Sequence, residues 1–302
     1  VCPQSHRRPD SHGSGSMTRT IGILGTGDMG SAVARCLAGE GMPVVTALEG
    51  RSAHSRSLAA DAGMTDKGSL NELVEAADII LSIMPPSEAK GFAAKLCPLI
   101  EASGRQVLFV DCNAVSPATT AGIGMIAARH GVRFHDVGIV GAAPRPDRTP
   151  VRFYASGAYG RDIESLATPL VDVRSIGDEP GKASALKMVF ASLTKGTNAL
   201  RAAALMAGEA LGVGEEIRAE WQESLPDVWR VMENRMAYFP SVAGRWTGEM
   251  REIAETYDAV GLTPRFHEGA EWVYEMLADA DVSADQDLDA ALAAFMTVLN
   301  NR

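Results

Sequence analysis

A loop of three spaced glycines follows the first apolar run of the chain and constrains its fold more than any other feature. Residues 21–24 are followed by Gly25, Gly27 and Gly30, a G-x-G-x-x-G spacing that leads into a helical pattern. In such a loop the first glycine permits a tight turn, the second lets the backbone approach a pyrophosphate, and the third lets helix and strand pack closely. A glycine-rich turn without a ligand has the same spacing, but this loop opens a strand–helix–strand pattern, as the motif requires. The sequence therefore predicts dinucleotide binding at Gly25, Gly27, Asp28, Met29 and Gly30.

The N-terminal half alternates short apolar runs with amphipathic stretches. Because the runs are apolar at successive positions, they are typical of strands buried on both faces of a mostly parallel sheet. We therefore expect an α/β domain of the Rossmann type, a doubly wound parallel sheet, over residues 19–180. Met84 and Pro85 follow one of the runs and are predicted to close the cofactor cleft at the carboxyl edge, although a plain turn remains an alternative. The predicted strands are residues 21–24, 44–48, 79–84, 107–110, 132–136, 152–155 and 171–176.

The pattern changes after Pro180. Residues 182–211 contain no proline and are rich in Ala, Leu and Met, which predicts one long buried helix. Helical patterns continue to the end of the chain, so we expect an all-α C-terminal domain over residues 181–302, joined to the first domain by the long helix. Residues 1–18 are expected to form a disordered leader, left by expression or by an upstream start, and are excluded from the fold.

The charge and cysteine content exclude several classes of protein. The net charge of −10, with no long basic run, argues against a nucleic-acid-binding surface. The chain lacks the roughly 18 consecutive apolar residues that a membrane helix needs. Four scattered cysteines without a CxxC pair predict a reducing, cytoplasmic location rather than a disulfide scaffold, and no residue cluster has metal-ligand spacing.

The residues after the second predicted strand bear on the choice of cofactor. An acidic residue there binds the free ribose hydroxyls of NAD, whereas Arg and Ser accommodate the 2′-phosphate of NADP. This chain has Glu49, Arg51, Ser52 and Arg56, so both features are present. Two arginines and a serine on one short loop favour NADP, with NAD possible; the alternative is that both arginines are merely solvated.

The long helix carries lysines among its apolar residues. Lys187 and Lys195 lie eight positions apart, roughly 80° around a helix with 100° per residue. A lysine on a buried stripe is costly unless it is paired or used, so these residues are candidate general acid/base groups with lowered pKa. The alternative is that each side chain reaches along the surface to solvent.

Four segments, taken in order, resemble the β-hydroxyacid dehydrogenase family, which includes 3-hydroxyisobutyrate, tartronate-semialdehyde and 6-phosphogluconate dehydrogenases. They are the glycine loop with its Met-Gly, residues 110–120 around Asn113, residues 136–142, and the helix around Lys187. The C-terminal half is similar to the branch with a variant phosphogluconate-dehydrogenase-like domain. The resemblance implies that Asn113 lies beneath the nicotinamide, that residues 136–142 form a substrate-carboxylate loop, and that Lys187 is the catalytic lysine.

The chain also departs from the family pattern. The usual asparagine one turn after the lysine is Ala191, and the serine of the substrate loop is Val140. The remaining substrate site is predicted to be the backbone at Gly141 and Ala142 together with Arg145. Lys195 and Asn113 are left as the groups that orient Lys187.

These observations together predict an NADP-dependent oxidoreductase that interconverts a small hydroxy acid and its oxo acid or semialdehyde. An NADPH-dependent imine or ketone reductase is the alternative, although retention of the lysine favours alcohol chemistry, and a nucleotide-binding protein without turnover is a third possibility. No metal is required for hydride transfer from nicotinamide. The resemblance and the apolar long helix further imply a homodimer through the helical domain.

Overall fold

An eight-stranded sheet forms the centre of the N-terminal half in the computed structural model, which describes residues 19–302. The strand order is β3-β2-β1-β4-β5-β6-β7-β8, and all neighbours run parallel except β6 and β7. The predicted leader, residues 1–18, lies outside the described residues. The strands are β1 (Ile21–Leu24), β2 (Val44–Thr46), β3 (Thr65–Asp66), β4 (Ile79–Ser82), β5 (Leu108–Asp111), β6 (Arg133–Val140), β7 (Val151–Ser156) and β8 (Val171–Ser175).

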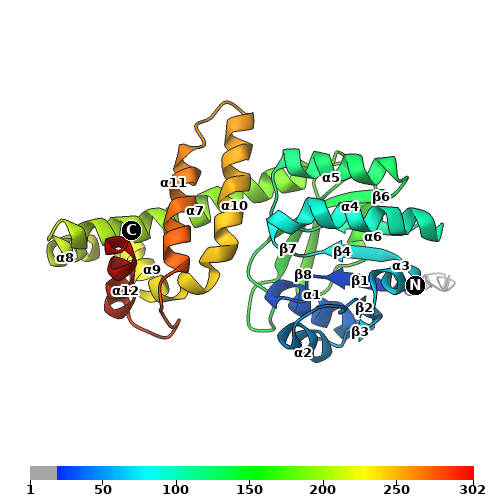
Figure 1. Cartoon of the computed structure of the whole chain (residues 1–302), viewed down its shortest axis with the longest axis horizontal. Coiled ribbons are helices and arrows are strands. Elements are labelled where there is room, and N and C mark those ends of the chain that lie inside the picture. The colour runs from blue at the N-terminus through cyan, green and yellow to red at the C-terminus, as the bar shows by residue number, and fades with distance from the viewer. Residues whose placement is uncertain (1–18) are drawn as a thin grey trace, which may run out of the picture.

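Helices cover both faces of this sheet. Along β4, Ile79 and Leu81 pack into the apolar core on one face, whereas Ile80 packs into the core on the other. This alternation confirms the prediction of strands buried on both sides. In Figure 1, α4 and α5 lie over one face while α1 and α2 lie over the other. The helices are α1 (Asp28–Gly39), α2 (Ala53–Asp61) and α6 (Gly160–Glu164) on one side, and α3 (Leu70–Ala76), α4 (Pro86–Ser103) and α5 (Pro117–Arg129) on the other.

Strand β6 differs from the expectation. It runs from Arg133 to Val140, so residues 136–140, which the resemblance placed in a substrate loop, are paired with β5 or β7 inside the sheet. The connection from β6 to β7 contains no helix, and a chain that returns without a crossover must pair antiparallel. Only Gly141 and the residues after it form the loop.

The C-terminal half is built around one long helix. Helix α7 (Lys182–Ala210) spans 29 residues, roughly 45 Å at 1.5 Å per residue, and runs from the sheet into the helical domain (Figure 1). Every regular element after it is helical, and Trp246 and Tyr274 pack in the shared core with their ring centroids 5.2 Å apart. These elements are α8 (Gly214–Ser224), α9 (Pro226–Arg235), η1 (Met236–Tyr238), α10 (Pro240–Ala259), α11 (Arg265–Ala278) and α12 (Leu288–Asn300).

The first turns of α7 pack directly against the sheet. The buried carboxylate of Asp136 on β6 accepts hydrogen bonds from the backbone N–H groups of Gly181 and Ser184, at 2.7 and 3.1 Å, and thereby caps the helix. A Cβ at Gly138 would lie 2.5 Å from the carbonyl oxygen of Ala183. Only glycine therefore allows α7 to approach β6 so closely. No helix within residues 19–302 is long and apolar enough to cross a membrane.

Candidate active site

The three positions of the loop require glycine for different reasons. Gly25 has a φ of 100°, and a Cβ there would lie 1.9 Å from the carbonyl oxygen of Ile83. A Cβ at Gly30 would lie 2.0 Å from the carbonyl oxygen of Gly25. A Cβ at Gly27 would meet nothing within 4 Å. The fold itself thus requires Gly25 and Gly30, whereas any requirement for Gly27 comes from something outside the chain.

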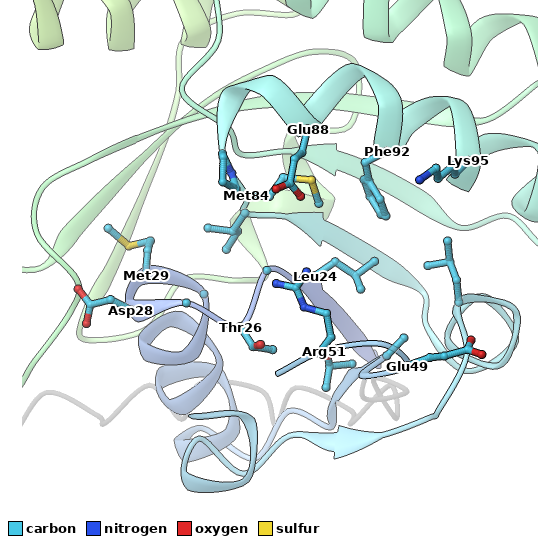
Figure 2. Close-up of a pocket in the computed structure, with 18 of the residues that line it drawn as sticks. Leu24, Thr26, Asp28, Met29, Glu49, Arg51, Met84, Glu88, Phe92 and Lys95 are labelled. Atoms are coloured by element: carbon cyan, nitrogen blue, oxygen red, sulfur yellow. The ribbon is translucent and has the colours of Figure 1, made fainter. Parts of the chain in front are cut away.

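A cavity of about 600 Å³ opens in front of this loop, between the ends of β1, β2 and β4 and the start of α4. Figure 2 shows Asp28 and Met29 at one end and Phe92 and Lys95 of α4 at the other. Predicted cofactor residues that line the cavity are Gly25, Gly27, Asp28, Met29, Gly30, Arg51, Met84 and Pro85. The glycine loop and the carboxyl ends of the strands therefore form one site.

The cavity wall has polar groups that suit a dinucleotide. The hydroxyl oxygens of Thr26 and Thr46 are buried there without a hydrogen-bond partner. Gly27 is the N-cap of α1, and the helix start has no side-chain cap. The backbone N–H groups of this helix start are therefore available for phosphate oxygens.

The predicted phosphate-binding residues on the loop after β2 make different contacts. Arg51 and Glu49 both line the cavity, and their side chains extend in different directions in Figure 2. Arg56 instead donates to the carbonyl oxygen of Leu48 at 2.5 Å. Ser52 caps α2, since its hydroxyl accepts from the N–H of Ser55 at 3.2 Å. Arg51 is consequently the residue of this loop best placed to meet a 2′-phosphate.

Asn113 supports the edge of the cavity rather than lining it. Its amide oxygen accepts from the N–H of Met84 at 2.7 Å, and its amide nitrogen donates to the hydroxyl of Ser82 at 2.9 Å and to Asp111. Burial raises the pKa of Asp111 to about 8, and the carboxyl of Asp136 adds to this rise. Asn113 therefore fixes the turn that carries Met84.

Lys187 lies where α7 crosses the end of β6. Its ammonium nitrogen donates to the carbonyl oxygen of Ile139 at 2.7 Å. Burial lowers the pKa of Lys187 to about 8, helped by the positive charge of Lys195 and opposed by the carboxylate of Glu249. A lysine with this pKa changes between ammonium and amine close to neutral pH, as a general acid/base requires.

Lys195 forms a buried ion pair with Glu249 of α10. The ammonium of Lys195 also lies 5.5 Å from the ring centroid of Trp246. Arg245, one turn before Glu249 on α10, lines the cavity at the glycine loop. The charged groups of α7 and α10 therefore connect the lysine site to the dinucleotide cavity.

The predicted substrate residues lie on the β6–β7 loop. Gly141 and Ala142 are exposed, and neither is among the cavity-lining residues. The guanidinium of Arg145 lies 3.9 Å from the carboxylate of Asp28, which places this loop beside the start of α1. Within residues 19–302 no three His, Cys, Asp or Glu side chains form a potential metal-binding group.

Glu249 and Arg245 were not predicted as site residues. Glu249 falls on the stripe of α10 that buries Trp246 and Ile253, because positions three and four apart share a helix face. An acidic residue on a buried stripe is the sequence feature that marks it. Arg245 lies beside that stripe and has no comparable sequence feature.

Two family models match the chain. The NAD-binding domain of 6-phosphogluconate dehydrogenase matches residues 20–169, and a domain of unknown function, DUF1932, matches residues 209–277. The chain belongs to the β-hydroxyacid dehydrogenase family. The predicted family and fold class are thus confirmed, and the match supports a nicotinamide dinucleotide as the ligand of the cavity.

Solved structures of similar proteins cover nearly the whole chain. A conserved protein of unknown function, described as structurally similar to 3-hydroxyacid dehydrogenases, is 26% identical, with a TM-score of 0.61 over 86% of this chain and 97% of its own. 3-Hydroxyisobutyrate dehydrogenase from Mycobacterium tuberculosis is 20% identical, with a TM-score of 0.66 over 92% and 99%. An imine reductase from Myxococcus stipitatus is 18% identical, with a TM-score of 0.56 over 92% and 99%. The latter two identities establish the shared fold alone.

Proposed function

We propose that this family member is an NADP-dependent oxidoreductase that interconverts a small hydroxy acid and the corresponding oxo acid or semialdehyde. The observation that carries the proposal is the position of Lys187. It is a half-buried lysine with a pKa of about 8, and the charged groups around it reach the dinucleotide cavity. A cofactor-binding protein without turnover has no need for such a costly group.

Lys187 performs the proton transfer in this mechanism. The nicotinamide cofactor supplies the hydride acceptor or donor. When an alcohol is oxidised, neutral Lys187 accepts the hydroxyl proton; when a carbonyl is reduced, the ammonium returns that proton to the oxygen. The carbonyl oxygen of Ile139 holds the side chain in place through both states.

The substrate carries a negative charge in this proposal. Lys187, Lys195 and Arg245 bring three cationic groups together against the single carboxylate of Glu249. This local excess of positive charge occurs in a chain with a net charge of −10. A carboxylate substrate complements it, with Arg245, the N–H groups of Gly141 and Ala142, or Arg145 as its binding groups.

The preference for NADP rests on Arg51. Its guanidinium lies in the cavity, whose wall also includes the carboxylates of Asp28, Glu49 and Glu88. A 2′-phosphate carries about two negative charges, so it gains more from Arg51 than a ribose hydroxyl does. NAD remains the alternative cofactor.

Cofactor binding and turnover test these points separately. Thermal unfolding is measured with NADPH and with NADH, and we expect the larger rise in Tm with NADPH. Arg51→Ala should remove this difference between the two cofactors. Turnover is then followed at the nicotinamide absorbance band with small 2- and 3-hydroxy acids, simple alcohols and cyclic imines. Binding without turnover of any compound contradicts the enzymatic proposal, and turnover of imines alone favours a reductase of the imine class.

We place the protein in the cytoplasm as a homodimer. Cys36, Cys97 and Cys112 are free thiols, which accords with a reducing compartment. The dimer is supported by the exposed apolar face of α7, with Leu193 and Leu200 exposed at 70% and 68%.

A further inference from the structure

The carboxylate of Asp136 on β6 holds the start of α7 through four hydrogen bonds. Its Oδ2 accepts from the backbone N–H groups of Gly181 and Ser184, at 2.7 and 3.1 Å, and from the hydroxyl of Ser156 at 3.0 Å. Its Oδ1 accepts from the hydroxyl of Ser184 at 2.7 Å. Asp136 is 0% exposed and is not among the residues that line the dinucleotide cavity. Its hydrogen bonds therefore serve the contact between strand and helix.

These hydrogen bonds replace a cap that α7 lacks. Gly181, the N-cap residue, has no side chain that could accept from the free N–H groups at the start of the helix. The N–H of Ala183 donates to the hydroxyl of Ser156 at 2.9 Å, and that hydroxyl donates in turn to Asp136. The acceptors thus come from β6 and from its neighbour β7, so they fix where α7 begins relative to the sheet.

The same strand holds Lys187. Its ammonium donates at 2.7 Å to the carbonyl oxygen of Ile139, three residues beyond the carboxylate along β6. Lys187 lies three residues beyond Ser184 on α7, a spacing that places both on one helix face. Between these two contacts, a Cβ at Gly138 would lie 2.5 Å from the carbonyl oxygen of Ala183 and 3.1 Å from the Cβ of Lys187. Successive residues of β6 therefore contact successive residues of the first turns of α7.

Proton transfer is sensitive to such a contact. A general acid/base works within roughly 2.6–3.2 Å of the atom that carries the proton. A shift of α7 by one residue along its axis is about 1.5 Å, and a misplacement of about 1 Å can lower a rate about 100-fold.

We propose that Asp136 is a positioning residue, which fixes α7 on β6 and thereby holds the Nζ of Lys187 at the end of the strand. Asp136 itself touches neither substrate nor cofactor. The inference rests on the proposed function in taking Lys187 as the group that moves the proton.

Two substitutions of Asp136 test this role. Asp136→Ala removes all four acceptors, so we expect kcat to fall about tenfold or more. The Kd for NADPH should change less than about twofold, because the glycine loop and the strand ends form the cavity. Asp136→Asn keeps the shape of the side chain and one oxygen acceptor, so it should restore most of the lost kcat.

The position of Lys187 can also be measured without a substrate. The chain contains only six lysines, so protein labelled with ¹³C at lysine Cε gives a spectrum that single lysine variants assign. With a pKa of about 8, Lys187 is an ammonium at pH 6, so its signal there reports its surroundings rather than a change of charge. In Asp136→Ala this signal should move toward those of the exposed lysines, and in Asp136→Asn it should return. The signal of Lys195, which Glu249 holds, should stay in place.

Asp162→Ala is the matched control. Asp162 of α6 is also a carboxylate that accepts from β6, but its partner is Arg133 at the start of the strand, away from α7. Its side chain is 17% exposed. This substitution should lower the Tm without changing the signal of Lys187 or kcat, when all variants are measured well below their Tm.

An unmoved Lys187 signal in Asp136→Ala, an equal movement in Asp162→Ala, or a moved signal with an unchanged kcat overturns the proposal. If Asp136→Ala does not fold, Ser184→Ala decides, because it removes the bond to Oδ1 and keeps both backbone bonds. An unmoved signal in Ser184→Ala then overturns it. A moved signal, with no turnover of any compound by the wild type, supports the positioning while contradicting the proposed function. Turnover by the wild type with unmoved signals in the variants does the reverse.

Discussion

At the scale of single residues, substitutions of Lys187 test the proposed proton transfer most directly. Lys187→Ala removes the proton acceptor, so we expect turnover to fall about 10²-fold or more. Lys187→Arg should fail almost as severely, because a guanidinium does not give up its proton near neutral pH. The Kd for NADPH should change little in both variants. Normal turnover in either variant would show that Lys187 has a structural role only.

The pH dependence of the reaction follows from the same residue. With a pKa of about 8, Lys187 is an ammonium below that pH and an amine above it. Oxidation needs the amine, so its rate should rise as the pH increases to about 8 and then level off. Reduction needs the ammonium, so its rate should be level below about 8 and fall above it. Initial rates in both directions across pH 6–10 check this, and parallel profiles in the two directions would contradict it.

At the scale of elements, substitutions in the glycine loop distinguish a glycine that packing requires from a glycine that ligand binding requires. Gly30→Ala sets a Cβ 2.0 Å from the carbonyl oxygen of Gly25, so we expect a loss of about 1–3 kcal/mol in the free energy of unfolding. Gly27→Ala meets nothing in the chain and should fold normally, but should weaken NADPH binding at least about tenfold, or about 1.4 kcal/mol. Gly39→Ala, at the other end of α1 and also free of contacts, is the control: it should leave NADPH affinity unchanged and should not lower the free energy of unfolding, because alanine favours a helix more than glycine does. Urea unfolding and a binding titration give the two quantities; normal NADPH affinity in Gly27→Ala would contradict the assignment.

The elements also show what the sequence could and could not predict. Periodicity and the glycine spacing were enough to predict the sheet, the long helix and the position of the cofactor cavity, because these features depend on local sequence patterns. The short β3 and α3 have too few residues for a periodic pattern, and β6 extends four residues beyond the predicted end. Glu249 could not be assigned to the site, because its partner is 54 positions away and only the packing of α10 on α7 brings them together.

At the scale of the whole molecule, the domain contact has a polar component that the sequence did not reveal. Glu252 of α10 accepts from the N–H of Ser116 at 2.7 Å, and Glu255 accepts from the hydroxyl of the same residue at 2.7 Å. Ser116 is the N-cap of α5, so carboxylates of the helical domain lie at the N-terminus of a helix of the Rossmann-type domain. This arrangement is favourable because the helix dipole is positive there. It adds a second connection between the domains, besides α7.

The outer face of the helical domain predicts the assembly state. Val189, Leu193 and Leu200 lie on one side of α7 and are 58–70% exposed. Phe266 of α11 is 77% exposed and lines a groove together with Leu193 and Leu200. A second copy of the chain would bury this face, so we expect light scattering to give about twice the chain mass of 31.9 kDa. Leu193→Glu places a charge in that interface and should give a monomer with an unchanged circular dichroism spectrum. Met125→Glu, at another exposed apolar position, on α5 (58%), is the control and should remain dimeric. A monomeric wild type at micromolar concentration, or a dimeric Leu193→Glu, would exclude this face as the interface.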